Sequence, residues 1–271
     1  MLQFLLQGKA GEHAGVLQGY RRKADFFACS CLGKDAADNV GRTPGGMLYH
    51  QRWNNIQFVT SASFLLAVYS DHLAGGAVRC SGGGGAVAGA AELLAFAKSQ
   101  VDYILGSNPR GTSYMVGYGA VYPRQAHHRG SSIASIRASP SFVSCREGYA
   151  SWYGRRGGNP NLLDGAVVGG PDEHDDFADE RNNYEQTEAA TYNNAPLMGI
   201  LARLAAGHGA RARGRLGQSL QHGIHRSILL GTYYYFFYRN DCNQKSSFDQ
   251  MHLCILLICR NRCKSHFTAS W

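Results

Sequence analysis

Residues 106–170 constrain the fold of this chain more than any other stretch, because they are long and contain no helical period. They are rich in Gly, Ser, Tyr and Arg, and they are interrupted by Pro109, Pro123, Pro140 and Pro160. In a chain whose other segments have helical periodicity, a structured stretch of this length without helices is usually functional rather than a simple connection. We therefore expect helices to form the core and loops to carry the chemistry.

Four other segments show the apolar spacing of three and four residues that indicates helices. The spacing predicts helices over 16–33 with Gly33 as a stop, 56–73, 90–105 with Gly106 as a C-cap, and 195–206 with Asn194 as N-cap and Pro196 in the first turn. In the first helix, Tyr20 belongs to the stripe that we expect to face the core. Between the second and third, SGGGGAVAG (81–89) is expected to be a flexible loop. The order of elements predicts an all-α architecture.

Composition separates the last residues from the rest of the 271-residue chain. Residues 207–271 carry nine Lys and Arg against two Asp, whereas the remainder carries eighteen against seventeen acidic residues. We expect a basic tail over 210–271, without a helical stripe, that is disordered or is translated past a genuine reading frame. A nucleic-acid-binding function would rest on this tail alone, and we expect no nucleic acid as a partner.

Eight cysteines are scattered without the paired spacing of a zinc site, at positions 29, 31, 80, 145, 242, 254, 259 and 263. The four in the body fit either buried thiols or one or two disulfides of a secreted protein. The N-terminus has no basic segment before its short apolar run, which argues against a signal peptide. The apolar run 253–259 is too short to span a bilayer, which takes roughly 20 residues. We expect no membrane partner, no metal and no cofactor, and a monomer.

An acidic stretch at 172–188 holds eight of the nineteen acidic residues of the chain. Carboxylates packed so closely tend to raise the pKa of at least one of them. Aromatic and amide side chains lie between them, and acids and amides among flat apolar faces suit a sugar-binding cleft. A solvated acidic loop, or a calcium loop built from oxygen ligands, remains an alternative interpretation of the composition.

Two motifs resemble those of glycoside hydrolase family 9, most closely the plant endo-β-1,4-glucanases of that family. FADERNNYEQTEAATYNNA contains Phe177, Asp179, Tyr184 and Glu188 at the spacing of the acidic motif of the family, and SYMVGYGAVYPRQAHHRGSS (113–132) matches a second motif. The resemblance runs from about residue 2 to 209, the C-terminal part of such a catalytic domain. It implies a partial (α/α)6 barrel, β-1,4-glucan (cellulose or hemicellulose) as partner, and secretion or the cell wall as location.

The resemblance also implies roles for individual residues. Glu188 matches the general acid, with the carboxylates Asp179 and Glu185 beside it. Asp179 matches the second acid of the motif, as an electrostatic and hydrogen-bonding partner, although it could instead pair with Arg181 or Arg129. His127 and Arg129 match a His-x-Arg pair that donates hydrogen bonds to sugar hydroxyls. We further expect Tyr184, Trp53 and His128 to bind substrate; Trp53 and Tyr184 could equally pack in the core.

The general base of the family lies in a DAGDN-like motif near the front of the domain, before the region that this chain resembles. The segment DAADN (35–39) is similar to this motif, but the residues around it match a different loop. We therefore reject Asp35 and Asp38 as catalytic aspartates. Inversion needs two carboxyl groups roughly 6.5–9.5 Å apart. We therefore expect this chain to be a poor hydrolase by itself, with a non-catalytic glucan-binding remnant as the alternative.

Overall fold

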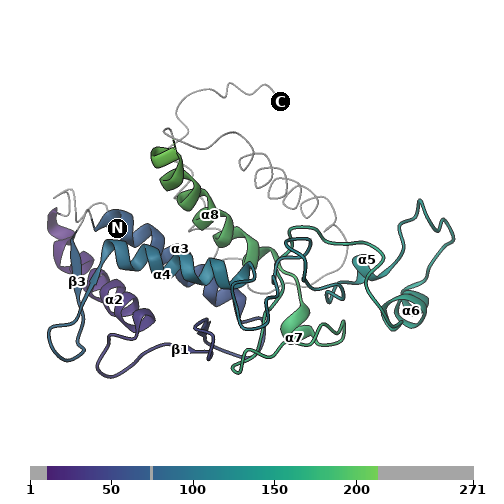
Figure 1. The fold of residues 1–271 in the computed structure, drawn as a ribbon, viewed down its shortest axis with the longest axis horizontal. Coiled ribbons are helices and arrows are strands. Elements are labelled where there is room, and N and C mark those ends of the chain that lie inside the picture. The colour runs from purple at the N-terminus through teal and green to yellow at the C-terminus, as the bar shows by residue number, and fades with distance from the viewer. Residues whose placement is uncertain (1–10, 74–75, 213–271) are drawn as a thin grey trace. The chain divides into compact units, whose positions relative to one another are not determined.

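Four long helices dominate the part of the chain described by the computed structural model, residues 11–73 and 76–212, with backbone alone for 207–212 (Figure 1). They are α2 (Ala14–Leu32), which follows the 3-10 turn Gly11–His13, α3 (Ile56–His72), α4 (Ala90–Ile104) and α8 (Thr191–Ala212). The chain divides into two units, Met1–Tyr233 and Tyr234–Trp271, and all described residues belong to the first. The predicted basic tail, apart from the last turn of α8, lies outside the described residues.

The helices predicted over 16–33, 56–73 and 90–105 are confirmed by α2, α3 and α4. Glycine ends two of them as expected, since Gly33 caps α2 with a φ of 71° and Gly106 follows α4 with a φ of 116°. The predicted core stripe of α2 is wrong at its first half. Tyr20 is 48% exposed, and the buried part of α2 is its C-terminal end, around Cys29 and Cys31.

Helix α8 begins four residues earlier than the sequence predicts, at Thr191. Asn194 is therefore inside the helix and does not cap it. Its side chain accepts the N–H of Val167 at 3.1 Å and donates to the carbonyl of Gly165 at 2.6 Å. Pro196 consequently lies in the second turn of the helix rather than the first. Asn and Pro are common start signals, but here tertiary contacts place them further along the helix.

Helix α3 is the centre of the core, because it packs against both α4 and α8. Its fully buried side chains include Ile56 and Leu66, and Leu93 of α4 and Ile200 of α8 are buried with them. Gly199 permits the close approach of α8, since a Cβ atom there would meet the ring of Phe64 at 2.4 Å. The buried aliphatic side chains give this contact its stability through the area that they remove from water.

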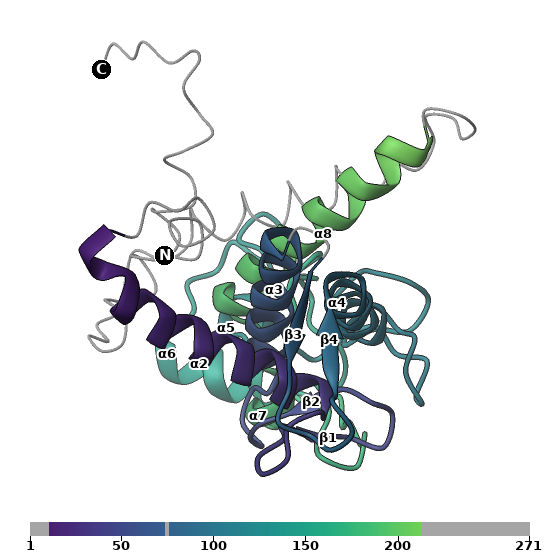
Figure 2. The same ribbon diagram turned by 90° about the vertical axis from the view of Figure 1, so that its left-hand side faces the viewer.

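Two short antiparallel pairs of strands accompany the helices, which the helical pattern does not predict (Figure 2). β1 (Gly41–Arg42) pairs with β2 (Leu48–Tyr49), and β3 (Ala77–Arg79) pairs with β4 (Val87–Gly89). The expectation of a flexible loop over 81–89 is thus wrong for its last three residues, which form β4. A disulfide between Cys29 of α2 and Cys80, just after β3, joins this hairpin to α2. Cys31 and Cys145 are free.

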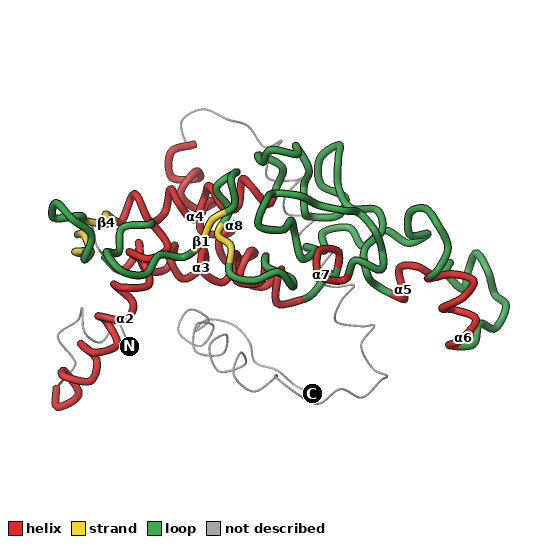
Figure 3. The backbone as a smooth tube through the Cα atoms, turned by 90° about the horizontal axis from the view of Figure 1, so that it is seen from below, coloured by secondary structure: helices red, strands yellow, loops and turns green. Residues whose placement is uncertain are grey.

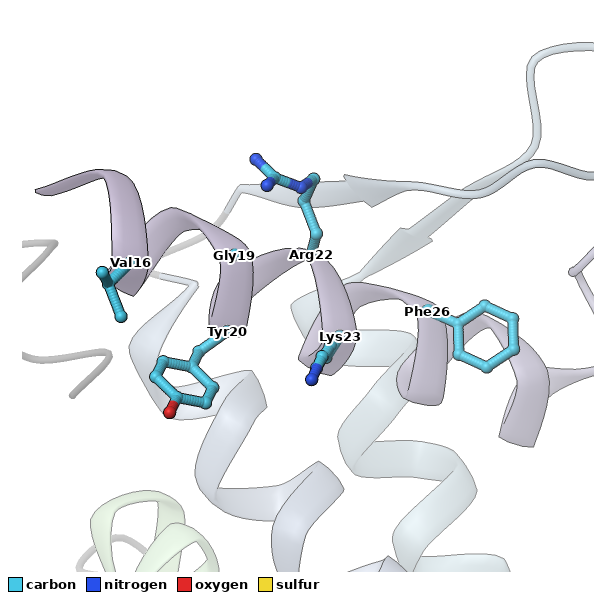
Figure 4. A pocket seen from close by; sticks show the side chains of 6 residues that line it. All are labelled: Val16, Gly19, Tyr20, Arg22, Lys23 and Phe26. Carbon is cyan, nitrogen blue, oxygen red and sulfur yellow. The ribbon is translucent and has the colours of Figure 1, made fainter.

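One face of α2 presents apolar side chains to the surroundings (Figure 4). Val16, Tyr20 and Phe26 are 63%, 48% and 46% exposed, and with Gly19, Arg22 and Lys23 they border a hollow of about 490 Å³. Isolated exposed apolar residues are ordinary, but several along one helix form a face that buries its apolar area only when another element packs on it.

The predicted absence of long helices over 106–170 is confirmed, and the loop-rich stretch continues to residue 190 (Figure 3). It contains α5 (Arg129–Ser132), α6 (Cys145–Glu147), a π-helical turn (Gly148–Tyr153) and α7 (Tyr184–Thr187). Isolated bridges tie Met115 to Val167 and His127 to Glu188. Across 11–73 and 76–212, none of the helices has the length and apolar character needed to span a bilayer.

Candidate functional site

The structure brings three of the predicted site residues together at Glu188. The backbone of His127 forms a parallel bridge with that of Glu188, and the His127 N–H donates to the carbonyl of Thr187 at 2.9 Å. From the turn that precedes α3, the indole Nε1–H of Trp53 donates to Oε2 of Glu188 at 3.2 Å. Trp53 and Glu188, which are 135 positions apart in the sequence, are therefore in direct contact.

Trp53 reaches Glu188 because the turn before α3 is held from both sides. Asn54 has a left-handed φ of 49°, a conformation that Asn tolerates better than most residues. Its N–H donates to the carbonyl of Glu185 at 2.8 Å, and its side-chain oxygen accepts from Asn193 of α8 at 2.9 Å. Both asparagines are fully buried. Trp53 itself is 43% exposed, so its ring is accessible rather than part of the core.

The imidazole of His127 is half-buried between two tyrosines. The ring of Tyr153 lies edge-on to it at 5.6 Å between centroids, and that of Tyr184 at 5.9 Å. Tyr153 is buried, whereas Tyr184 is 51% exposed on α7, directly before Glu188. The structure thus gives Tyr184 an accessible ring face, and it makes Tyr153 a supporting residue behind His127.

Arg181 is a buried cation that holds the loop behind His127. It is 4% exposed, and its guanidinium donates to the Asn159 side chain at 2.6 Å and to the carbonyls of Tyr153, Arg155 and Gly157 at 2.6–2.8 Å. Burial lowers the pKa of this guanidinium from its ordinary value. Four acceptors around one planar fork fix the path of residues 153–159.

Asp179 accepts two backbone N–H groups, from Arg124 at 2.8 Å and Gln125 at 2.9 Å. Its carboxylate therefore fixes the segment that leads into His127, two residues later. The guanidinium of Arg181 is directed at carbonyls, so the alternative pairing of Asp179 with Arg181 is not what the structure shows. The two carboxylate oxygens of Asp179 thus both accept from the backbone.

Several acids of the predicted cluster have separate structural partners. Asp175, 4% exposed, accepts the N–H of Gly45 at 2.5 Å and the hydroxyl of Tyr103, whose pKa is raised by burial. Asp176 pairs with Arg110 at 2.8 Å, and Glu185 pairs with the Nε of Arg52 at 2.5 Å.

These three acids and Asp179 therefore anchor loops. In the described part of the chain, no three His, Cys, Asp or Glu side chains gather as they would around a metal ion.

The two other predicted binding residues lie at α5. Arg129 is the first residue of that helix and is exposed. His128 precedes the helix, and its Nδ1 accepts the N–H of Ser131 at 3.1 Å. Burial, and next the charge of His127, lowers the pKa of His128. The structure thus makes His128 the N-cap of α5, with Nδ1 as the capping acceptor.

Sequence reasoning missed four residues that shape this site: Asn54, Tyr153, Arg181 and Asn193. Arg181 and Asn193 lie inside the quoted acidic motif, so their presence was visible and their roles were not. Tyr153 and Asn54 have no local signal, because each acts on a segment at least 26 residues away. By contrast, the rejected Asp35 accepts the N–H of Ala37 and the hydroxyl of Ser81, which lowers the pKa of Asp35.

Known proteins resemble this chain over most of its described length. The sequence profile described as glycosyl hydrolase family 9 matches residues 1–201. Endoglucanase 1 from Oryza sativa subsp. japonica is 74% identical over 211 residues, which are 76% of this chain and 33% of that protein. Endoglucanase 6 from Arabidopsis thaliana is 62% identical over 208 residues, with the same coverage. The chain thus spans about a third of the length of these curated relatives.

Among solved structures, the endoglucanase from the termite Nasutitermes takasagoensis superposes with a TM-score of 0.55 at 27% identity. The match covers 70% of this chain and 37% of that one.

Proposed function

This chain belongs to glycosyl hydrolase family 9, and from that premise we propose that its loop region forms the acid side of a site that hydrolyses internal β-1,4-glucosidic bonds. The substrate is cellulose or a related β-glucan, as the name endoglucanase of the relatives suggests. The observation that carries this proposal is the contact of the Trp53 indole N–H with Glu188 beside the bridge to His127.

The contact with Trp53 supports different tasks for the two oxygens of Glu188. An indole N–H can only donate, so Oε2 must serve as its acceptor. The proton of the acid form then belongs on Oε1, which delivers it to the leaving glycosidic oxygen. Protonation of that oxygen lets the bond break while water attacks the opposite face of the sugar, which inverts the anomeric carbon.

The remaining predicted residues have supporting tasks. The accessible rings of Trp53 and Tyr184 can stack on glucose units. Asp179 holds the backbone that leads to His127, so we assign it to positioning rather than to proton transfer. Arg129, exposed at the start of α5, can donate to sugar hydroxyls.

We further propose that the described helices belong to the two rings of an (α/α)6 barrel. The exposed apolar face of α2, with Val16, Tyr20 and Phe26, would then pack on another helix of such a barrel. The disulfide between Cys29 and Cys80 suits the oxidising surroundings of a secreted or cell-wall protein.

We propose that the DAADN segment does not supply the general base. Asp35 is occupied by Ser81 and by backbone N–H groups, and we assign the base to the DAGDN-like motif of the family. The 271-residue chain alone should therefore be a poor hydrolase, and binding of glucan without cleavage is the second candidate function. The hydrogen bonds that occupy Asp35 are the observation that favours this second candidate.

Hydrolysis tests both candidates. We expect the chain alone to release few reducing ends from carboxymethylcellulose. With a family segment carrying the DAGDN-like motif joined ahead of it, cleavage should appear with inversion. Glu188→Gln should then lower the rate by roughly 10²–10⁴-fold.

Glu173→Gln, which changes an exposed acid, is the control and should leave the rate unchanged. Cleavage that survives Glu188→Gln would show that Glu188 is not the acid.

A further inference from the structure

Three polar atoms behind His127 form a closed triangle. Nδ1 of His127 lies 2.8 Å from the carbonyl oxygen of Arg181 and 2.7 Å from the hydroxyl oxygen of Tyr153. That hydroxyl lies 2.9 Å from the same Arg181 oxygen. All three separations are hydrogen-bond distances, so each needs a donor on one side and an acceptor on the other.

Only one arrangement of protons on the neutral ring satisfies all three sides. The Arg181 carbonyl can only accept, and it has two lone pairs. If Nδ1 carries the proton, Nδ1–H and the Tyr153 hydroxyl both donate to this carbonyl, and a lone pair of the Tyr153 oxygen faces Nδ1–H. If the proton were on Nε2, Nδ1 and the Arg181 oxygen would be two acceptors 2.8 Å apart.

The triangle is held rigidly by the rest of the loop region. The Arg181 side chain bonds the carbonyl of Tyr153 at 2.6 Å, so one residue fixes both the hydroxyl-bearing loop and the accepting carbonyl. Tyr153 is 9% exposed, and burial raises the pKa of its phenol, which keeps the hydroxyl proton in place. The Tyr153 ring lies edge-on to the imidazole and limits its rotation.

We propose that Tyr153 and Arg181 are positioning residues that hold neutral His127 with its proton on Nδ1, so that Nε2 accepts a hydrogen bond from a hydroxyl of the glucan. The role of the sugar rests on the proposed function, whereas the position of the proton rests on the triangle alone. This assignment reverses the direction expected from the sequence, in which His127 donates to the sugar.

The tautomer is measured directly by nuclear magnetic resonance on the full chain labelled with ¹⁵N-histidine. At alkaline pH, where histidines are neutral, correlations between the ring nitrogens and carbon-bound protons distinguish a protonated from an unprotonated nitrogen. We expect His127 to show protonated Nδ1 and unprotonated Nε2, the opposite of the form that dominates free histidine. A protonated Nε2 in the unmodified chain would overturn the proposal.

Two variants test the positioning role. Arg181→Lys keeps the charge but loses the planar fork, and Tyr153→Phe removes only the hydroxyl. Each should shift His127 toward the form protonated on Nε2, whereas Arg156→Lys, an exposed arginine on the same loop, should not. If Arg181→Lys fails to fold, Tyr153→Phe alone still tests the positioning role. Wild-type spectra from both variants would overturn the positioning role.

The sugar is tested by adding cellotetraose to the same sample. We expect the Nε2 signal of His127 to move with saturation while Nδ1 changes little. Saturable binding with an unmoved Nε2 would overturn the acceptor role and leave the proposed function intact. Absence of any binding would count against the proposed function, and the spectrum without sugar would still report the tautomer.

Discussion

The two regions of this molecule are stabilised in different ways. The helical region, α2, α3, α4 and α8, is held by buried aliphatic side chains such as Leu93 and Ile200. The loop region, residues 106–190, contributes residues such as Val167 to the same core, and in addition it is held by side chains that bond distant backbone groups, with Arg181 as the clearest example. The hydrophobic contacts tolerate small shifts, whereas the hydrogen bonds of the loop region require defined geometry. A site that needs fixed positions therefore lies where hydrogen bonds set them.

We expect the dependence between the regions to run mainly in one direction. The N–H groups of Asn54 and Ile56 at the start of α3 donate to the carbonyls of Glu185 and Gly169 in the loop region. Asn193 of α8 donates to the carbonyl of Val167 at 3.0 Å. The loops are thus attached to the ends of helices that pack on one another. Damage to the helical region should loosen both regions, while damage to the loop region should leave the helices folded.

The largest effect should follow from removing the disulfide of the helical region. It closes a loop of 51 residues, for which the chain-entropy model gives about 4 kcal/mol. We expect Cys29→Ser with Cys80→Ser to lower the free energy of unfolding by about this amount in chemical denaturation. Cys145→Ser, at an exposed free cysteine, is the control and should change little. If the double variant lost no more unfolding free energy than the control, the disulfide would not stabilise the helical region.

Replacing Arg181 should affect the loop region selectively. Arg181→Met leaves the carbonyls of Tyr153, Arg155 and Gly157 without their buried donor, which should cost about 3 kcal/mol locally. Amide hydrogen exchange is the measurement. We expect protection to fall across 124–188 and to persist in α3 and α4. Equal loss of protection in the helices would contradict the one-way dependence.

A smaller effect should come from crowding the contact between α3 and α8. The added Cβ of Gly199→Ala meets the Phe64 ring, and overpacking of this kind costs about 1–3 kcal/mol. Both regions should lose stability in thermal unfolding. Gly15→Ala is the matched control, because a Cβ at this helical position meets nothing within 4 Å. An unchanged stability in Gly199→Ala would show that the helices separate there without cost.

The smallest effect concerns pH. Because burial lowers the pKa of His128 in the folded state, the unfolded chain binds the proton more readily. The stability that this residue contributes is therefore complete above its pKa in the unfolded chain, about 6.5. It is lost as the pH falls toward the lower pKa of the folded state. We expect unfolding curves of the wild type to lose more stability on acidification than those of His128→Asn, which keeps a capping acceptor. Parallel curves would contradict this role.

The fold was predictable from the sequence wherever its cause is local. Apolar spacing and terminal glycines place α2, α3 and α4 within a few residues, because both act within one helix. The start of α8 was mispredicted because Asn194, a good cap by itself, is used by Gly165 and Val167 instead. The pairing of Cys29 with Cys80 was left open, since spacing along the chain does not determine which cysteines meet.

The candidate site was predictable in its two central residues, Glu188 and His127, and not in their supports. The motifs identified Glu188 and His127, and the structure places them side by side. The motifs did not show that Tyr153 and Arg181 enclose His127, or that Asn54 turns Trp53 toward Glu188. These roles follow from contacts between segments that only the folded chain brings together.

A β-glucan site at Glu188 is tested most sharply through the indole N–H that contacts this residue. The chain has three tryptophans, Trp53, Trp152 and Trp271, so three indole signals are expected, and Trp53→Phe identifies one of them. On titration with cellotetraose, we expect the Trp53 signal to move most and to saturate, and we expect maltotetraose, with its α-linkages, to have little effect. A Trp53 signal that stays in place with cellotetraose, or moves equally with maltotetraose, would contradict a β-glucan site at Glu188.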